Sequence, residues 1–238
     1  TAITVSKQDL PIPSVSFRGP TEITSFRSDE LTLRTTASAA TCGEGEPEMI
    51  FAWTVTDQND DSIVADDFAT LDPKRLKVPA HMLTAGHTYL VEFQATMAET
   101  GASHIFGSAT ATVTCVSSEL VASIAGGNRI VGATQDWYLD GSTSYDPDDS
   151  TGVVPLAYAW SCETIAIDGS KSAGCQSASD EPAVQFVGLA VVDMLPNSLA
   201  VGTFVITLEV SSSSDTVSRS SSTSVQITVA PGAPPIVS

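Results

Sequence analysis

Apolar and polar residues alternate one by one in several segments of this 238-residue chain. Every second residue is apolar in segments 88–97, 109–115, 203–210 and 225–229. A period of two means that one face of a strand is buried and the other is solvated, which is typical of antiparallel sheets. Because no long segment has the 3.6-residue period of a helix, the pattern predicts an all-β protein.

The two halves of the chain repeat the same pattern. "IFAWTV" around Trp53 parallels "AYAWSC" around Trp160, 107 residues later, and Gly86 parallels Gly202 at an offset of 116. The larger second offset predicts a nine-residue insertion after Trp160. Both tryptophans share the parity of the apolar positions around them, so we expect their indoles in the two cores.

Short strands at this spacing, repeated in two modules, are typical of β-sandwiches. The sequence therefore predicts two tandem immunoglobulin-like antiparallel β-sandwich domains, at 1–116 and 117–231. Segment 232–238, "GAPPIVS", is expected to be a linker or the start of a further module. We expect the chain to be a piece of a longer protein.

The formal net charge is −18, and both halves are acidic. This charge argues against nucleic acid or an anionic membrane as partner, because phosphate binding needs clusters of Lys and Arg. No apolar run reaches the ~18 residues of a membrane span, so no direct membrane insertion is expected. The first residues also lack the pattern of a signal peptide.

No catalytic motif is present. The metalloprotease, nucleophile-elbow and P-loop signatures are all missing from the sequence. His81, His87 and His104 all lie in the first half at spacings that match no helical metal pair, and they are expected in loops or at edges. We therefore expect a protein that is not an enzyme.

The stretch "YLDGSTSYDPDDS" (138–150) is rich in aspartate. Asp146 followed by Pro147 suits a turn, since Asp can bond its own downstream backbone and Pro presets φ. The alternative is a weak calcium site, because a hard cation prefers several carboxylate oxygens. The four candidate ligands are Asp140, Asp146, Asp148 and Asp149. No other cofactor is expected.

Each half contains two cysteines. Cys115 lies on the inward face of its strand, and Cys42 is its only available partner in that half. Cys162 also faces inward, thirteen residues before Cys175. This arrangement predicts the disulfides Cys42–Cys115 and Cys162–Cys175 and an oxidising compartment; the alternative is four free thiols in a cytosolic protein.

The tract "SSSSDTVSRSSSTS" (211–224) lies between two predicted strands. It predicts a hairpin with a small polar surface, and the alternative is a tract that carries O-linked sugars. No N-x-[ST] sequon occurs, so N-glycosylation is not expected.

Residues 120–229, with "LDGSTSYDPDD", "AYAW" and "LAVGTFVITLEV", resemble the PKD and REJ (receptor for egg jelly) type modules of extracellular proteins. The first half matches more loosely, because "LRTTAS" replaces "LDGSTS" and the DPD is missing. The PKD hallmark W-x-F-G-D-G is also missing, and "AWSCETI…GC" is more similar to REJ. The resemblance implies immunoglobulin-like sandwiches with extracellular adhesion or structural roles.

The expected function is that of non-catalytic structural or adhesion modules in a larger secreted or cell-surface protein, able to assemble into a surface array or filament. The expected partners are other copies or modules of the same protein, or other extracellular proteins and glycans. One alternative is the ligand- or force-sensing ectodomain of a polycystin-like receptor. Another is a carbohydrate-binding accessory module of a secreted hydrolase.

Overall fold

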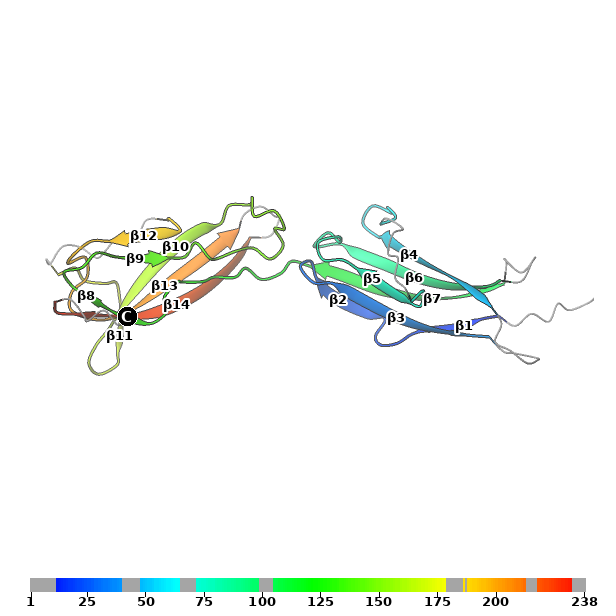
Figure 1. The fold of residues 1–238 in the computed structure, drawn as a ribbon, viewed down its shortest axis with the longest axis horizontal. Coiled ribbons are helices and arrows are strands. Elements are labelled where there is room, and N and C mark those ends of the chain that lie inside the picture. Colours follow the sequence, from blue (N-terminus) through cyan, green and yellow to red (C-terminus); the bar gives the residue numbers. More distant parts are fainter. Residues whose placement is uncertain are drawn as a thin grey trace, which may run out of the picture. The chain divides into compact units, whose positions relative to one another are not determined.

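The computed structural model describes residues 12–39, 48–64, 72–98, 105–178, 186, 188–212 and 218–232. In these ranges the chain forms strands, turns and isolated bridges (Figure 1), which confirms the all-β prediction. None of the described residues belongs to a helix long and apolar enough to cross a membrane. The chain divides into two compact units, Thr1–Ser118 and Glu119–Ser238, two residues beyond the predicted division.

The first unit contains two sheets. Its strands are β1 (Ser14–Phe17), β2 (Glu22–Phe26), β3 (Leu31–Ser38), β4 (Met49–Asp57), β5 (Arg75–Val78), β6 (Thr88–Met97) and β7 (Phe106–Val116). One sheet has the order β1-β3-β5 and the other the order β2-β7-β6-β4. Neighbouring strands are antiparallel, except that β2 runs parallel to β7.

The second unit also contains two sheets, with five strands in the larger and two in the smaller. Its strands are β8 (Arg129–Gly132), β9 (Trp137–Asp140), β10 (Ala157–Ile165), β11 (Lys171–Ala173), β12 (Val191–Met194), β13 (Gly202–Ser212) and β14 (Arg219–Ala230). The sheets have the orders β11-β10-β13-β14-β8 and β12-β9, and β8 runs parallel to β14 as β2 does to β7.

Each unit has its own hydrophobic cluster between its two sheets, as in an immunoglobulin-like sandwich. Along β6 and β13, buried residues alternate with more exposed ones, which confirms the strands predicted from the period of two. Phe93, Ile206 and Leu208 are fully buried on these strands. The central strands therefore supply much of each core.

The two tryptophans occupy matching strands but are not equally buried. Trp160 on β10 is 9% exposed. Trp53 on β4 is only half-buried and packs beside Phe17 and Phe93, with ring centroids 5.9 and 4.6 Å away. The prediction of a core indole therefore holds for Trp160 and in part for Trp53.

The strand pairing also corrects the alignment of the two halves. The residues opposite Trp53 and Trp160 are Phe93 and Leu208, which lie 115 residues apart. The repeat is therefore one residue shorter at this point than the pairing of Gly86 with Gly202 suggested. The extra residues of the second unit lie between Trp160 and Leu208, in the part of the chain that contains the β10–β11 hairpin and Cys175.

Candidate functional site

The aspartate-rich motif begins at the end of β9. The Asp140 carboxylate accepts hydrogen bonds from the Ser142 hydroxyl at 2.6 Å and from the Ser142 backbone N–H at 2.9 Å. These bonds favour the charged form and lower the pKa of Asp140. The first aspartate is thus engaged by its own turn.

Gly141 allows a close approach between the turn and the core. A Cβ at this position would lie 2.6 Å from Cδ2 of Leu208 and 3.1 Å from Cζ2 of Trp160. In the first unit Thr35 makes the corresponding backbone bond: its N–H donates to the Lys74 carbonyl at 2.9 Å, as that of Gly141 does to Ala190 at 2.8 Å. A side chain is therefore present at this point in the first unit, where the tryptophan is less buried.

Ser144 ties the motif to the segment that enters the second unit. Its hydroxyl accepts from the Ser123 N–H at 3.0 Å and donates to the Ser123 carbonyl at 3.2 Å. Next to it, Val121 and Tyr145 form an antiparallel bridge. This serine has a structural role.

Asp146 and Asp148 hold an arginine from the far end of the unit. Nη2 of Arg219 lies 2.6 Å from Oδ2 of Asp146, and its Nη1 lies 3.0 Å from Oδ1 of Asp146 and 3.3 Å from Oδ2 of Asp148. The exposed side-chain fractions are 11% for Arg219, 4% for Asp146 and 8% for Asp148. This ion pair is largely shielded from water.

The backbone turn predicted for Asp146 is also present, since the Asp148 N–H donates to Asp146 Oδ1 at 2.9 Å. The arginine was missed by sequence reasoning. The signal that could have indicated it is a single Arg in the otherwise small and polar tract 211–224. Arg219 is the first residue of β14.

Asp149 closes the motif by capping the turn that follows it. Its Oδ1 accepts from the Thr151 hydroxyl at 2.6 Å and from the N–H groups of Thr151 and Gly152, while its Oδ2 accepts from the Val154 N–H at 2.6 Å. These bonds, with that of the Thr151 hydroxyl first, lower the pKa of Asp149 to about 2.

The structure does not bring the four aspartates together around one point. Asp140 and Asp149 bond to their own turns, and Asp146 and Asp148 bond to Arg219. Among the described residues, no group of three or more His, Cys, Asp or Glu side chains could hold a metal ion. Calcium binding stays a prediction, and two of its four candidate ligands hold a guanidinium.

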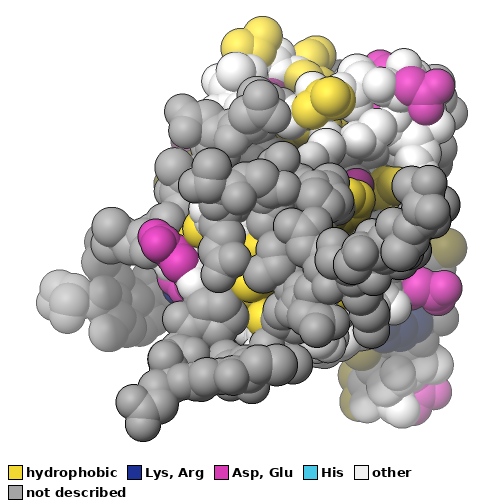
Figure 2. All heavy atoms as spheres, turned by 90° about the vertical axis from the view of Figure 1, so that its right-hand side faces the viewer, with side chains coloured by type: hydrophobic (Ala, Val, Ile, Leu, Met, Phe, Trp, Pro, Cys, Tyr) yellow, Lys and Arg dark blue, Asp and Glu magenta, His cyan; other side chains and the backbone are white. Residues whose placement is uncertain are grey.

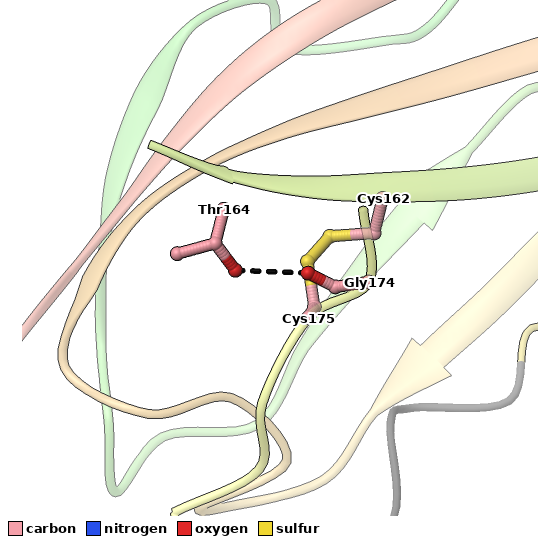
Figure 3. Close-up of a disulfide and its surroundings, with 4 residues drawn as sticks. All are labelled: Cys162, Thr164, Gly174 and Cys175. Carbon is pink, nitrogen blue, oxygen red and sulfur yellow. Dashed lines mark hydrogen bonds between the residues drawn. A yellow bond between two sulfur atoms is a disulfide. The ribbon is translucent and has the colours of Figure 1, made fainter. Parts of the chain in front are cut away.

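The disulfide Cys162–Cys175 joins β10 to the segment that follows β11 (Figure 3) and confirms the predicted pairing. The two Cα atoms lie 5.6 Å apart, a usual separation for a disulfide. The Thr164 hydroxyl donates to the Gly174 carbonyl at 2.9 Å beside it. Cys115 is buried on β7, whereas Cys42 lies outside the described residues, so the Cys42–Cys115 bridge stays a prediction.

A second hydrogen-bonded pair of polar side chains lies in the first unit, where sequence reasoning expected only a loop histidine. Nδ1 of His87 lies 2.6 Å from Oδ2 of Asp57, and the Asn59 N–H donates to Oδ1 of Asp57 at 2.9 Å. Burial raises the pKa of Asp57, but the bonds from His87 and Asn59 outweigh it, so the pKa lies below its usual value. The signal was the inward parity of Asp57 with Val55.

This pair has two members of a catalytic triad but not the third. No serine, threonine or cysteine among the described residues bonds to the His87 ring, and the Asp57 carboxylate is 7% exposed. His81 lies in a turn with a φ of 64°, as expected of a loop residue, and His104 lies outside the described residues. The pair joins the end of β4 to the start of β6.

A shallow groove of about 380 Å³ lies on the outer face of β10, β13 and β14. Its lining is mostly small or hydroxylated: Ala159, Trp160, Ser161, Thr207, Glu209, Ser220, Ser221 and Ser222. The serine tract contributes because Ser212 pairs with Arg219 across the β13–β14 hairpin, which confirms the predicted hairpin. The groove offers hydroxyl groups and one carboxylate to a polar ligand.

The basic residues of the second unit are all engaged. Arg129 donates to the carbonyls of Tyr138 at 2.6 Å and Ala125 at 3.0 Å, and Nζ of Lys171 lies 3.5 Å from Oε2 of Glu163. Arg219 holds Asp146 and Asp148. Figure 2 views the molecule from the end at which the first unit lies nearest the viewer, and among its coloured atoms acidic side chains appear at several places.

Comparison with known proteins gives one family and several distant structures. The REJ domain family matches residues 36–238. The three N-terminal domains of the Highly Immunogenic Outer Capsid protein (Hoc) of bacteriophage RB49 are 9% identical, with a TM-score of 0.33, over 92% of this chain and 69% of that chain. The Clostridium thermocellum CbhA fibronectin(III)-like modules are 11% identical, with a TM-score of 0.28, over 92% of this chain and 95% of that chain. Drosophila N-cadherin EC1-3 is 10% identical, with a TM-score of 0.32, over 92% of this chain and 68% of that chain.

Proposed function

We propose, because this chain belongs to the REJ domain family, that it is a non-catalytic extracellular binding module that serves adhesion or builds a surface structure. The observation that carries the proposal is the family match over residues 36–238, which includes most of the first unit and all of the second. The match agrees with the resemblance inferred from the DGS and DPD motifs.

The chemistry of the described residues supports a structural role for the motif. Its aspartates, glycine and serines contact backbone, core or Arg219. A disulfide such as Cys162–Cys175 is typical of oxidising compartments, which favours a position outside the cell.

The partners we propose are other copies or modules of the same protein, or other extracellular proteins. Repeated contacts of this kind would let the modules assemble into an array or filament. A ligand- or force-sensing receptor ectodomain would use the same scaffold, and the rest of the parent protein distinguishes the two roles.

Carbohydrate binding is the second candidate, and the hydroxyl-lined groove favours it. Ser161, Thr207 and Glu209 offer donors and acceptors to the hydroxyl groups of a sugar. Exposed aromatic rings, on which sugars stack, are not part of its lining, because Trp160 is 9% exposed. The groove is therefore the place to test for a glycan ligand.

O-linked sugars on the serine tract are a further part of the proposal. Ser220, Ser222 and Ser224 on β14 are exposed and point away from the core, opposite in parity to Val225 and Ile227. The intact mass of the secreted protein before and after O-glycosidase treatment measures this modification.

A bead assay tests the main proposal. Beads that carry the chain should aggregate with each other, and free chain should inhibit the aggregation. Dispersed beads at every ionic strength, together with binding to soluble oligosaccharides, would favour the second candidate. Ala159→Trp fills the groove and should abolish oligosaccharide binding, while Ile167→Trp, in an exposed turn, serves as the matched control.

A further inference from the structure

The aspartate motif suggests a cation, and the structure provides one from the protein itself. We infer that Arg219 is the resident cation of the turn formed by Asp146 and Asp148, and that the second unit is therefore held together without Ca²⁺. The inference concerns how the module is stabilised and does not depend on which partner it binds.

The geometry of the ion pair supports this inference. Two nitrogens of the guanidinium face the two oxygens of Asp146 at 2.6 and 3.0 Å, which is the bidentate arrangement that a planar guanidinium favours. Nη1 also reaches Asp148 at 3.3 Å. One arginine thus bonds both carboxylates.

Burial makes a cation necessary at this position. The side chains of Asp146 and Asp148 are only 4% and 8% exposed, and a buried carboxylate is costly unless it is paired and hydrogen-bonded. Arg219 is itself 11% exposed, so solvent screens the pair weakly. Removal of the arginine would leave two neighbouring buried carboxylates without the positive charge of its guanidinium.

The remaining acids of the motif do not complete a calcium shell. Ca²⁺ takes six to eight oxygen ligands. Asp140 and Asp149 direct their oxygens to the hydroxyl and N–H groups of Ser142, Thr151, Gly152 and Val154. In the native chain the two buried carboxylates therefore serve the arginine.

The ion pair also joins parts of the chain that are far apart in sequence. Asp146 and Arg219 are separated by 73 residues, and Arg219 starts β14, which pairs with β13 and β8. The pair therefore fixes the turn before β10 to the start of the last strand. The first unit, which lacks the DPD, has no equivalent residues in its sequence.

The test compares thermal unfolding of the full chain in millimolar Ca²⁺ and in EDTA, with hydrogen exchange of peptides from β10 and β14 as a second readout. The wild-type midpoint and exchange should be the same in both solutions. Arg219→Met should unfold several degrees lower in EDTA, with faster exchange in β14, and Ca²⁺ should restore part of the loss. If Arg219→Met does not fold, Arg219→Lys, which keeps the charge but loses the fork, should show a smaller loss.

Two controls separate this site from general effects. Arg129→Met removes the arginine that bonds backbone carbonyls, so it should destabilise the second unit without any response to Ca²⁺. The double variant Asp146→Asn/Arg219→Met should also lack the response. A wild-type midpoint that rises with Ca²⁺, an Arg219→Met variant as stable as wild type in EDTA, or no recovery of that variant in Ca²⁺ would each overturn the inference.

Discussion

Asp149 is the most extensively hydrogen-bonded carboxylate of the motif, and its titration is the first prediction at the scale of single residues. The bond from the Thr151 hydroxyl is the largest cause of its lowered pKa, and the pKa is about 2. A carboxyl ¹³C NMR titration should therefore show this group ionised throughout the usual range of Asp. Thr151→Val should raise the midpoint, while that of Asp140 stays unchanged. A wild-type midpoint near the ordinary value of 3.8 would contradict the hydrogen bonding described.

Asp57 predicts an acid-sensitive step in the first unit. Burial raises the pKa of Asp57, but the hydrogen bonds from His87 and Asn59 lower it by more, so the pKa lies below 3.8. A carboxylate with a depressed folded-state pKa stabilises the protein above its unfolded pKa. This stability is lost as the pH falls through the folded value.

Hydrogen exchange of β4 and β6 between neutral pH and pH 2 measures this loss. Protection of these strands should fall below the unfolded pKa of Asp57 in the wild type. Asp57→Asn should be less protected at neutral pH and should change less across the acid range. Asp61→Asn, a neighbour in an exposed turn, serves as the control and should follow the wild type.

At the scale of elements, the close approach of the turn after β9 to strands β13 and β10 depends on Gly141. Gly141→Ala would place a methyl group 2.6 Å from Leu208 Cδ2, so the core must shift. Overpacking of this kind costs about 1–3 kcal/mol in free energy of unfolding. Gly202→Ala is the matched control, since its Cβ would meet Phe204 at 3.7 Å, an ordinary contact. Equal stability of the two variants in urea unfolding would contradict the close approach.

The β10–β11 hairpin depends in the same way on its disulfide. Cys162 and Cys175 are 13 residues apart, and a crosslink over a loop of this size contributes about 3 kcal/mol. The Cys162→Ala/Cys175→Ala variant should lower the melting midpoint of the second unit by on the order of 10 °C in calorimetry. Exchange in β6, which belongs to the first unit, should stay unchanged. A midpoint equal to that of wild type would show that the hairpin packs without the crosslink.

What the sequence could predict at this scale depended on local pattern. The strands β6 and β13 were predictable, because apolar and polar residues alternate along the sequence in the same way as buried and more exposed residues alternate along the strands. The contacts of Asp57 with His87 and of Asp146 with Arg219 were not, because they join residues 30 and 73 positions apart. The calcium hypothesis has the same origin. The aspartates are close together in the sequence and therefore visible as a cluster, whereas the arginine that binds two of them is 73 positions away from Asp146.

At the scale of the whole molecule, charge decides how copies approach each other. The chain carries a formal net charge of −18, and in the second unit Arg129, Lys171 and Arg219 are bound to groups of the same unit. Two such chains repel at distances shorter than the Debye length, which is about 10 Å at 0.1 M salt and longer at lower salt. Attraction between copies therefore requires short-range contacts that outweigh this repulsion.

Ionic strength consequently distinguishes the proposed partners. If copies of this protein bind each other, bead aggregation and the attraction measured by light scattering should increase from low to physiological salt, because screening removes the net repulsion. If the partner is a different protein with a basic surface, the same increase in salt should weaken capture of the beads. Glycine at matched osmolality, which adds no net ions, is the control and should change neither. Self-aggregation that weakens as salt is added would contradict the argument that net repulsion opposes the contact, and would point to complementary charged patches on the two copies.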